Sequence, residues 1–164
     1  MTKPLIIIFI FLFVSCGPSH KKSKQEILEE KAEYYYNKEI YKEAIPYFDQ
    51  LINIDSTKGV YYLKRGFCYD KLFYQRFAYS DYQKAIKLKY GIAVAYLHIG
   101  VMYSENEQDS LALIYYDKSL SLDSSRYQNI QILKRISQEM IKSRKNNPAA
   151  WKEFEEFKKR KGLN

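Results

Sequence analysis

The stretch Gly59–Tyr90, GVYYLKRGFCYDKLFYQRFAYSDYQKAIKLKY, carries a pattern that returns along the chain every 34 residues. In it the small residues Gly66 and Ala78 are each followed, within three or four positions, by a tyrosine, Tyr69 or Tyr82. The matching sets are Ala32, Tyr35, Ala44 and Phe48 on one side, and Gly100, Tyr103, Ala112 and Tyr116 on the other. Small residues at such places let two helices touch closely, so the pattern predicts three helical hairpins that stack on one another.

A fixed period of 34 residues with these residue types resembles the tetratricopeptide repeat (TPR). The resemblance covers Gln25 to Arg126, which is three full repeats without a gap. It implies an all-α fold, a right-handed solenoid of helical hairpins completed by C-terminal capping helices. It also implies a surface that binds other proteins.

Local signals place the helices of the first repeat. Ser23 and Glu26 form the Ser-x-x-Glu pattern of a capping box, which predicts a helix from there to about Asn37. A second helix is expected from about Tyr41 to Ile54. The three repeats together are expected to occupy residues 23–126.

The N-terminus reads as an export signal followed by a lipid anchor. Lys3 precedes ten uninterrupted apolar residues, Leu5 to Val14, which are too few to span a membrane as a helix. Phe13-Val14-Ser15-Cys16 resembles a bacterial lipobox, which implies that residues 1–15 are removed and Cys16 is acylated. Gly17 after the cysteine resembles the signal for release to the outer membrane, most simply to its periplasmic face. Residues 16–22 would then be a short lipidated tether.

Charge is distributed unevenly along the chain. From Cys16 to Ser125, 15 basic and 15 acidic residues cancel, whereas the segment from Arg126 onward has 11 basic and 4 acidic residues. A solvated helix face explains the basic C-terminus, and anionic lipid headgroups are the functional alternative. Nucleic acid is not an expected partner of an exported chain.

In the TPR family the first helices of successive repeats line the ligand groove. The resemblance places groove residues at Glu33, Val60, Leu63, Phe67, Val94, Leu97 and Val101. Glu33, Phe67 and Val101 stand where family members that clamp a partner's C-terminal carboxylate have asparagine, so no carboxylate clamp is expected. A groove that is acidic at one end and apolar in its middle suits an amphipathic helix.

The C-terminal segment, residues 127–164, is expected to cap the solenoid. Ile130, Leu133, Ile136 and Met140 are predicted to share one face of a helix, and Lys134 at the small-residue place argues against a full fourth repeat. Asn147-Pro148 starts a last helix with Trp151, Phe154 and Phe157. That helix could fold onto the groove, extend the stack, or be offered to a partner.

Residues for catalysis or metal binding are not apparent in the sequence. Cys68 occupies a position of small packed residues, and the two histidines, His20 and His98, lack metal-ligand spacing. We expect no enzyme activity, no metal and no cofactor. The expected function is a membrane-anchored scaffold that recruits other envelope proteins, and the alternative is a structural lipoprotein that associates with itself.

Overall fold

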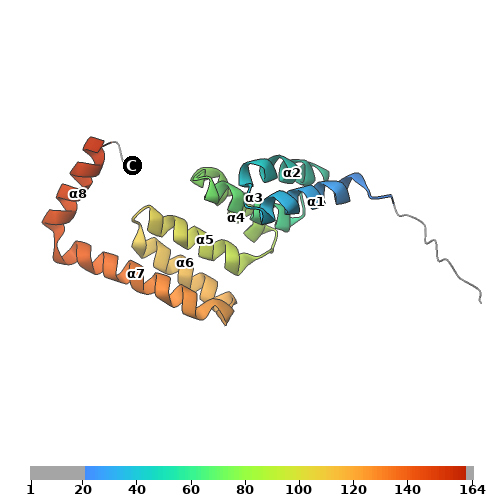
Figure 1. Ribbon diagram of the computed structural model, residues 1–164. Helices are drawn as coiled ribbons and strands as arrows, with labels where there is room; N and C mark the ends of the chain where they lie inside the picture. Colours follow the sequence, from blue (N-terminus) through green and yellow to red (C-terminus); the bar gives the residue numbers. More distant parts are fainter. Residues whose placement is uncertain (1–20, 162–164) are drawn as a thin grey trace, which may run out of the picture.

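The structure is a computed structural model that describes residues 21–161. The predicted signal peptide and Cys16 lie outside the described residues. Within residues 21–161 the secondary structure is helical, and strands are absent from this range. The helices are α1 (Lys24–Asn37), α2 (Tyr41–Ile54), α3 (Gly59–Lys71), α4 (Gln75–Lys87), α5 (Ile92–Glu105), α6 (Asp109–Leu122), the short 3₁₀ helix η1 (Ser124–Arg126), α7 (Tyr127–Asn146) and α8 (Pro148–Lys161) (Figure 1).

The first six helices form the three expected hairpins, stacked in chain order (Figure 1). The predicted capping box is confirmed: the amide of Glu26 donates to the Ser23 hydroxyl at 3.2 Å and the amide of Ser23 to the Glu26 carboxylate at 2.6 Å. The predicted end of α1 at Asn37 and the bounds of α2 are also confirmed. Local sequence signals therefore suffice to place the helices of the first repeat.

The turn inside each repeat has the same backbone geometry. Its central residue adopts a left-handed φ, which is 60° at Glu39, 61° at Phe73 and 61° at Glu107. The next amide donates back to the carbonyl of the recurring tyrosine, at 2.9 Å for Tyr35, 2.9 Å for Tyr69 and 2.8 Å for Tyr103. This bond closes the end of the first helix in the manner of a Schellman motif, although none of the three turns has glycine there.

The recurring residues make the core inside each hairpin. The alanines at both small positions are fully buried, and the ring of Phe48, Tyr82 or Tyr116 fills the space between the two helices. A methyl group placed on Gly66 would lie 3.1 Å from the Tyr82 ring, and one placed on Gly100 would lie 2.7 Å from the Tyr116 ring. The close approach of helix and ring thus explains the small residues.

Helix α7 stacks on the third repeat, but its buried face differs from the prediction. Ile130 is fully buried and Leu133 packs against the same cluster, whereas Ile136 is 52% exposed. Ser137 is buried in its place, with its hydroxyl 3.2 Å from that of Ser104. The predicted face was wrong at Ile136, because helix α7 turns its Ser137 side toward the end of α5.

Helix α8 turns sharply away from the end of α7 and runs along the edge of the solenoid (Figure 1). The Asn147 side chain caps it, accepting from the amide of Ala150 at 3.2 Å. Within the described range α8 does not form a hairpin with α7, and it does not lie on the predicted groove (Figure 1). Lys134 of α7, at the place where a small residue would admit a partner helix, pairs with Asp117 instead.

Arg144 holds the junction of α7 and α8 against the turn between α5 and α6. Its guanidinium donates to the Glu107 carbonyl at 2.5 Å and lies 3.1 Å from the buried Asp109 carboxylate. The Trp151 ring of α8 covers the same guanidinium, with its centroid 4.9 Å away. Helix α8 is thus fixed to the third repeat through a charged contact rather than through a shared apolar core.

Candidate functional site

The residues predicted to line a groove come from the first helices of the repeats. Glu33 lies on α1; Val60, Leu63 and Phe67 lie on α3; and Val94, Leu97 and Val101 lie on α5. All seven are half-buried. The surface formed by these seven residues is called the inner face below.

The apolar residues of the inner face pack partly into the core, each against a particular buried cluster. Val60 packs against the core of the first repeat, and Leu63 packs against that of the second and third. Leu97 and Val101 pack in the cluster that contains Ile130 of α7. Each of these side chains therefore helps to join neighbouring repeats while leaving part of its surface to solvent.

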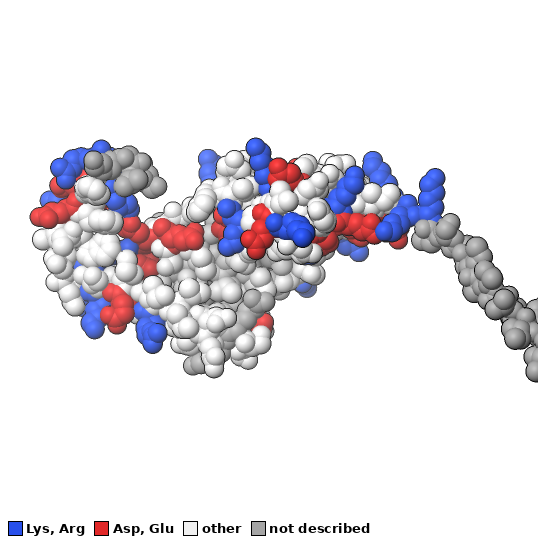
Figure 2. Space-filling model, viewed as in Figure 1, with Lys and Arg blue, Asp and Glu red and all other residues white. Residues whose placement is uncertain are grey.

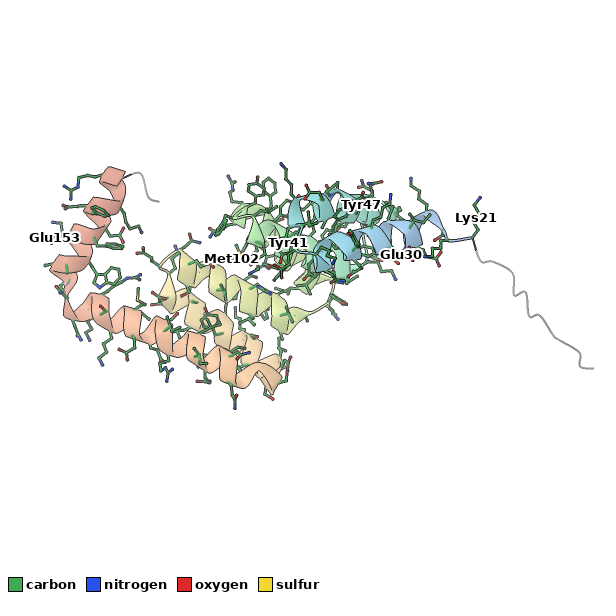
Figure 3. The ribbon with its side chains drawn as sticks, viewed as in Figure 1. Lys21, Glu30, Tyr41, Tyr47, Met102 and Glu153 are labelled. Atoms are coloured by element: carbon green, nitrogen blue, oxygen red, sulfur yellow. The ribbon has the colours of Figure 1, made fainter. Side chains whose placement is uncertain are left out.

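Phe67 sits at the centre of the inner face, inside a set of aromatic rings. Its ring centroid lies 5.6 Å from that of Tyr36, 5.8 Å from Tyr41 and 5.2 Å from His98 (Tyr41 is labelled in Figure 3). The ammonium of Lys71 lies 5.2 Å from the ring centre of Phe67. Phe67 is thus a structural bridge between three repeats, and only part of its ring is open to a ligand.

His98 belongs to this set, although the sequence suggested no role for it. It stacks on Tyr82 at 5.4 Å with an interplanar angle of 13°. Its Nδ1 lies 3.6 Å from the Asp70 carboxylate, which also accepts a hydrogen bond from the Tyr82 hydroxyl at 3.3 Å. Burial raises the pKa of Tyr82 well above its usual range, and Asp70 adds to the effect.

At the end of the inner face on α1, where the sequence predicted acidic residues, the carboxylates are paired with side chains of α3. Glu33 forms an ion pair with Lys64 of α3, and Lys64 also lies over the Tyr36 ring. The Tyr61 hydroxyl donates to the Glu29 carboxylate. Both carboxylates are therefore engaged by α3, and a ligand at this end would compete with those contacts.

The sequence did not predict the residues that surround Phe67 on the inner face, which are Tyr36, Tyr41, Asp70 and His98, or the buried Tyr82 on which His98 stacks. One signal could have found some of them. Tyr36, Phe67 and His98 are spaced by 31 residues, as are Glu33 and Lys64. A spacing of 31 residues equals the 34-residue repeat minus about one helical turn. It therefore links residues that meet diagonally on the first helices of neighbouring repeats.

Two hollows lie at the edge where the turns within the repeats are stacked, away from the inner face. One of 650 Å³ lies between α4 and α5 and is lined by Tyr79, Met102 and Tyr103 (Met102 is labelled in Figure 3). The other, of 640 Å³, lies between the turns at Phe73 and Glu107 and helix α8. The Gln75–Asn106 side-chain hydrogen bond, 2.9 Å long, is shared by the walls of both.

Neither an activated thiol nor a metal-binding cluster is present among residues 21–161. Cys68 is fully buried, and burial raises the pKa of its thiol to about 12, so it is a poor nucleophile near neutral pH. Among residues 21–161, no cluster of three histidine, cysteine or acidic side chains could hold a metal ion. The same range contains no helix long and apolar enough to cross a membrane.

Comparison with solved structures identifies the architecture. The TPR2B domain of yeast Sti1, from its pHsp70 complex, matches with a TM-score of 0.64 and 19% sequence identity. The match covers 70% of this chain and 96% of that domain. The fold is a tetratricopeptide-repeat solenoid. The first TPR domain of human RPAP3 matches at 0.64 and 23% identity, covering 74% of this chain and 95% of that one.

A further TPR neighbour carries a ligand. The first TPR domain of Spaghetti (RPAP3), bound to the HSP90 peptide SRMEEVD, matches with a TM-score of 0.63 and 25% identity. It covers 76% of this chain and 99% of that chain. No protein-family model matches the sequence, and no curated protein does. The likeness to these solved structures establishes the fold and leaves the ligand of this chain open.

Proposed function

We propose that this chain is a non-catalytic, membrane-anchored TPR protein that recruits or assembles other proteins in the bacterial cell envelope. The inner face carries this proposal. It places partly open apolar and aromatic side chains on the first helices of three stacked repeats, without α8 lying over them (Figure 1). Complexes of structurally similar TPR domains, that of Sti1 with pHsp70 and that of Spaghetti with an HSP90 peptide, support the same proposal.

The residues of the inner face favour an apolar or amphipathic helical segment over a free C-terminal carboxylate. Glu33, Phe67 and Val101 stand at the places that carry asparagine in clamping relatives. The Glu33 carboxylate is already paired with Lys64 and has no donor for a second carboxylate, and the side chains of the other two donate no hydrogen bond. Leu63, Leu97 and Val101 instead offer partly open apolar surface, which suits anchors spaced by three or four residues on one side of a helix.

Membrane attachment is the second part of the proposal. Acylation of Cys16 would hold the protein at the periplasmic face of the outer membrane, because two buried acyl chains suffice for stable anchoring. Labelled palmitate supplied to the native host should enter the wild-type protein and not Cys16→Ser. A Cys16→Ser protein that keeps both the label and its place in the membrane fraction would refute the lipid anchor.

Site-specific crosslinking in the native host tests the binding role. A photo-crosslinking residue at Leu97 samples the inner face, and one at Ile114, 49% exposed on α6, is the matched control on a second helix. We expect capture of one envelope protein from position 97 and not from position 114. Capture of a second copy of this chain at position 97 would support the self-associating structural lipoprotein instead, and equal capture at both positions would refute the inner face as a specific surface.

A further inference from the structure

Phe73 has an unusual position in the second repeat. It adopts the left-handed backbone conformation that Glu39 and Glu107 adopt at the same place in the other two repeats. That conformation is unfavourable for a bulky residue, and the side chain is 81% exposed, so it adds little to the core. The fold therefore gives no reason for a phenylalanine where the other repeats have glutamate.

Two more exposed aromatic residues follow Phe73 closely in the chain. Tyr74 is 55% exposed and Phe77 is 62% exposed, and both rings touch Tyr69, with centroids 6.4 Å and 5.3 Å away. An aromatic cluster of this kind, open to solvent at the edge of a solenoid, is typical of an interaction surface.

Helix α8 forms a wall opposite Phe73. The hollow of 640 Å³ between them, called the edge cleft below, is bounded by Phe73, by Glu105 and Glu107, and by Glu155 and Lys158 of α8. Figure 2 shows the notch beside α8, with acidic side chains on its floor. Glu153 points to the outer side of α8 (Figure 3), whereas Lys158 reaches inward to pair with Glu107. The Gln75–Asn106 hydrogen bond joins the two turns, so the floor is formed before any ligand binds.

The charges of the edge cleft favour a cationic ligand. Three carboxylates face one ammonium, and Lys158 is already shared between Glu107 and Glu155. Arg144 also lies against Glu107, at 3.4 Å. Glu105, in the wall of the edge cleft, has no such close ion-pair partner among residues 21–161. Burial and the nearby Asp70 raise its pKa, and Lys71 acts against them. A cation brought beside Glu105 would relieve this unfavourable environment.

We propose that the edge cleft binds a peptide segment that carries an apolar or aromatic side chain next to a lysine or arginine. The apolar side chain packs against Phe73, the exposed aromatic residue of the edge cleft. The cation pairs with Glu105. The edge cleft is separate from the inner face, so this inference and the proposed function can fail independently.

Selection of peptides tests the proposal. A phage-displayed library of random 12-residue peptides is selected on the full-length chain in detergent, and the best peptides are then measured by fluorescence anisotropy. We expect enrichment of an aromatic or aliphatic residue beside lysine or arginine. Phe73→Glu should weaken binding at least tenfold, and its fold should persist because Glu39 and Glu107 occupy the equivalent positions. Glu105→Gln should weaken binding several-fold.

Ile114→Glu, on an unrelated exposed surface, is the control and should bind as the wild type does. Equal affinity of Phe73→Glu and wild type would overturn the proposal, as would enrichment of peptides without a cation. Loss of binding in Leu97→Ser with Phe73→Glu unaffected would place the peptides on the inner face and also overturn it. A change from dimer to monomer in Phe73→Glu without any peptide effect would show a second copy of the chain in the edge cleft, contrary to the proposal.

Discussion

The Arg65 guanidinium donates two parallel hydrogen bonds to the Asp81 carboxylate, from Nε at 2.8 Å and from Nη2 at 2.7 Å. The remaining nitrogen, Nη1, donates to Asp49 at 2.6 Å. Asp49 lies on α2, Arg65 on α3 and Asp81 on α4, so one guanidinium ties the first repeat to both helices of the second. The Asp81 side chain is only 7% exposed, and it depends on Arg65 for its partners.

Removal of this guanidinium should therefore be costly. Arg65→Ala leaves a nearly buried carboxylate without its counterion, and we expect it to lower the free energy of unfolding by about 3–5 kcal/mol. Urea denaturation followed by circular dichroism measures this. Arg76→Ala, which removes an exposed arginine of α4, should change stability by no more than about 0.5 kcal/mol. Similar losses in both variants would contradict the assigned role of Arg65.

The two core glycines should differ in their tolerance of alanine. A Cβ on Gly100 would lie 2.7 Å from the buried Tyr116 ring, and we expect Gly100→Ala to cost about 1–3 kcal/mol through overpacking. A Cβ on Gly66 would lie 3.1 Å from Tyr82, so a milder clash is offset by about 1 kcal/mol of helix propensity. Thermal or urea unfolding of both variants should show Gly100→Ala to be the less stable. The reverse order would refute this account of the packing.

The Cys68 thiol should be protected in the folded protein. Burial raises its pKa to about 12, so little thiolate exists at pH 8 and reagent has no access to the sulfur. In a Cys16→Ser chain, Cys68 is the remaining cysteine. Its reaction with a disulfide reagent should be slow under native conditions and complete at once in concentrated urea. Rapid stoichiometric labelling of the native chain would show that α3 is not packed as described.

Acidic pH should weaken the docking of α8 on the third repeat. The hydrogen bond from Lys158 lowers the pKa of Glu107, so this contact stabilises the folded state above the ordinary glutamate pKa and is lost as the pH falls through the lowered value. Fluorescence of Trp151, the only tryptophan of the chain, reports the event because its ring covers Arg144.

We expect the fluorescence to stay constant from about pH 7 to pH 5 and to change below about pH 4.3, the ordinary glutamate value. Lys158→Ala should move the midpoint to higher pH, since the group that lowers the pKa of Glu107 is gone. Lys152→Ala, on the exposed side of α8, should leave the midpoint in place. If both variants had the same midpoint, the fluorescence change would not result from loss of the Glu107–Lys158 contact.

The sequence by itself determined the repeat architecture. The 34-residue spacing of small residues and aromatic rings specifies how each hairpin closes, because the small residues and the ring that fills the space between the two helices belong to the same repeat. The capping residues Ser23 and Asn147 likewise act on amides only a few positions away. Because the residues involved lie close together in the sequence, such contacts can be predicted without knowledge of the fold.

Only the tertiary structure decided what surrounds the functional surfaces. The rings around Phe67, the pairing of Glu33 with Lys64 and the inward turn of Ser137 depend on how one helix lies across another. The position of α8 depends on Arg144 reaching Asp109, 35 positions earlier in the chain. Packing of separate elements fixes these distances, and a hydrophobic pattern along a single helix does not encode the angle at which its neighbour arrives.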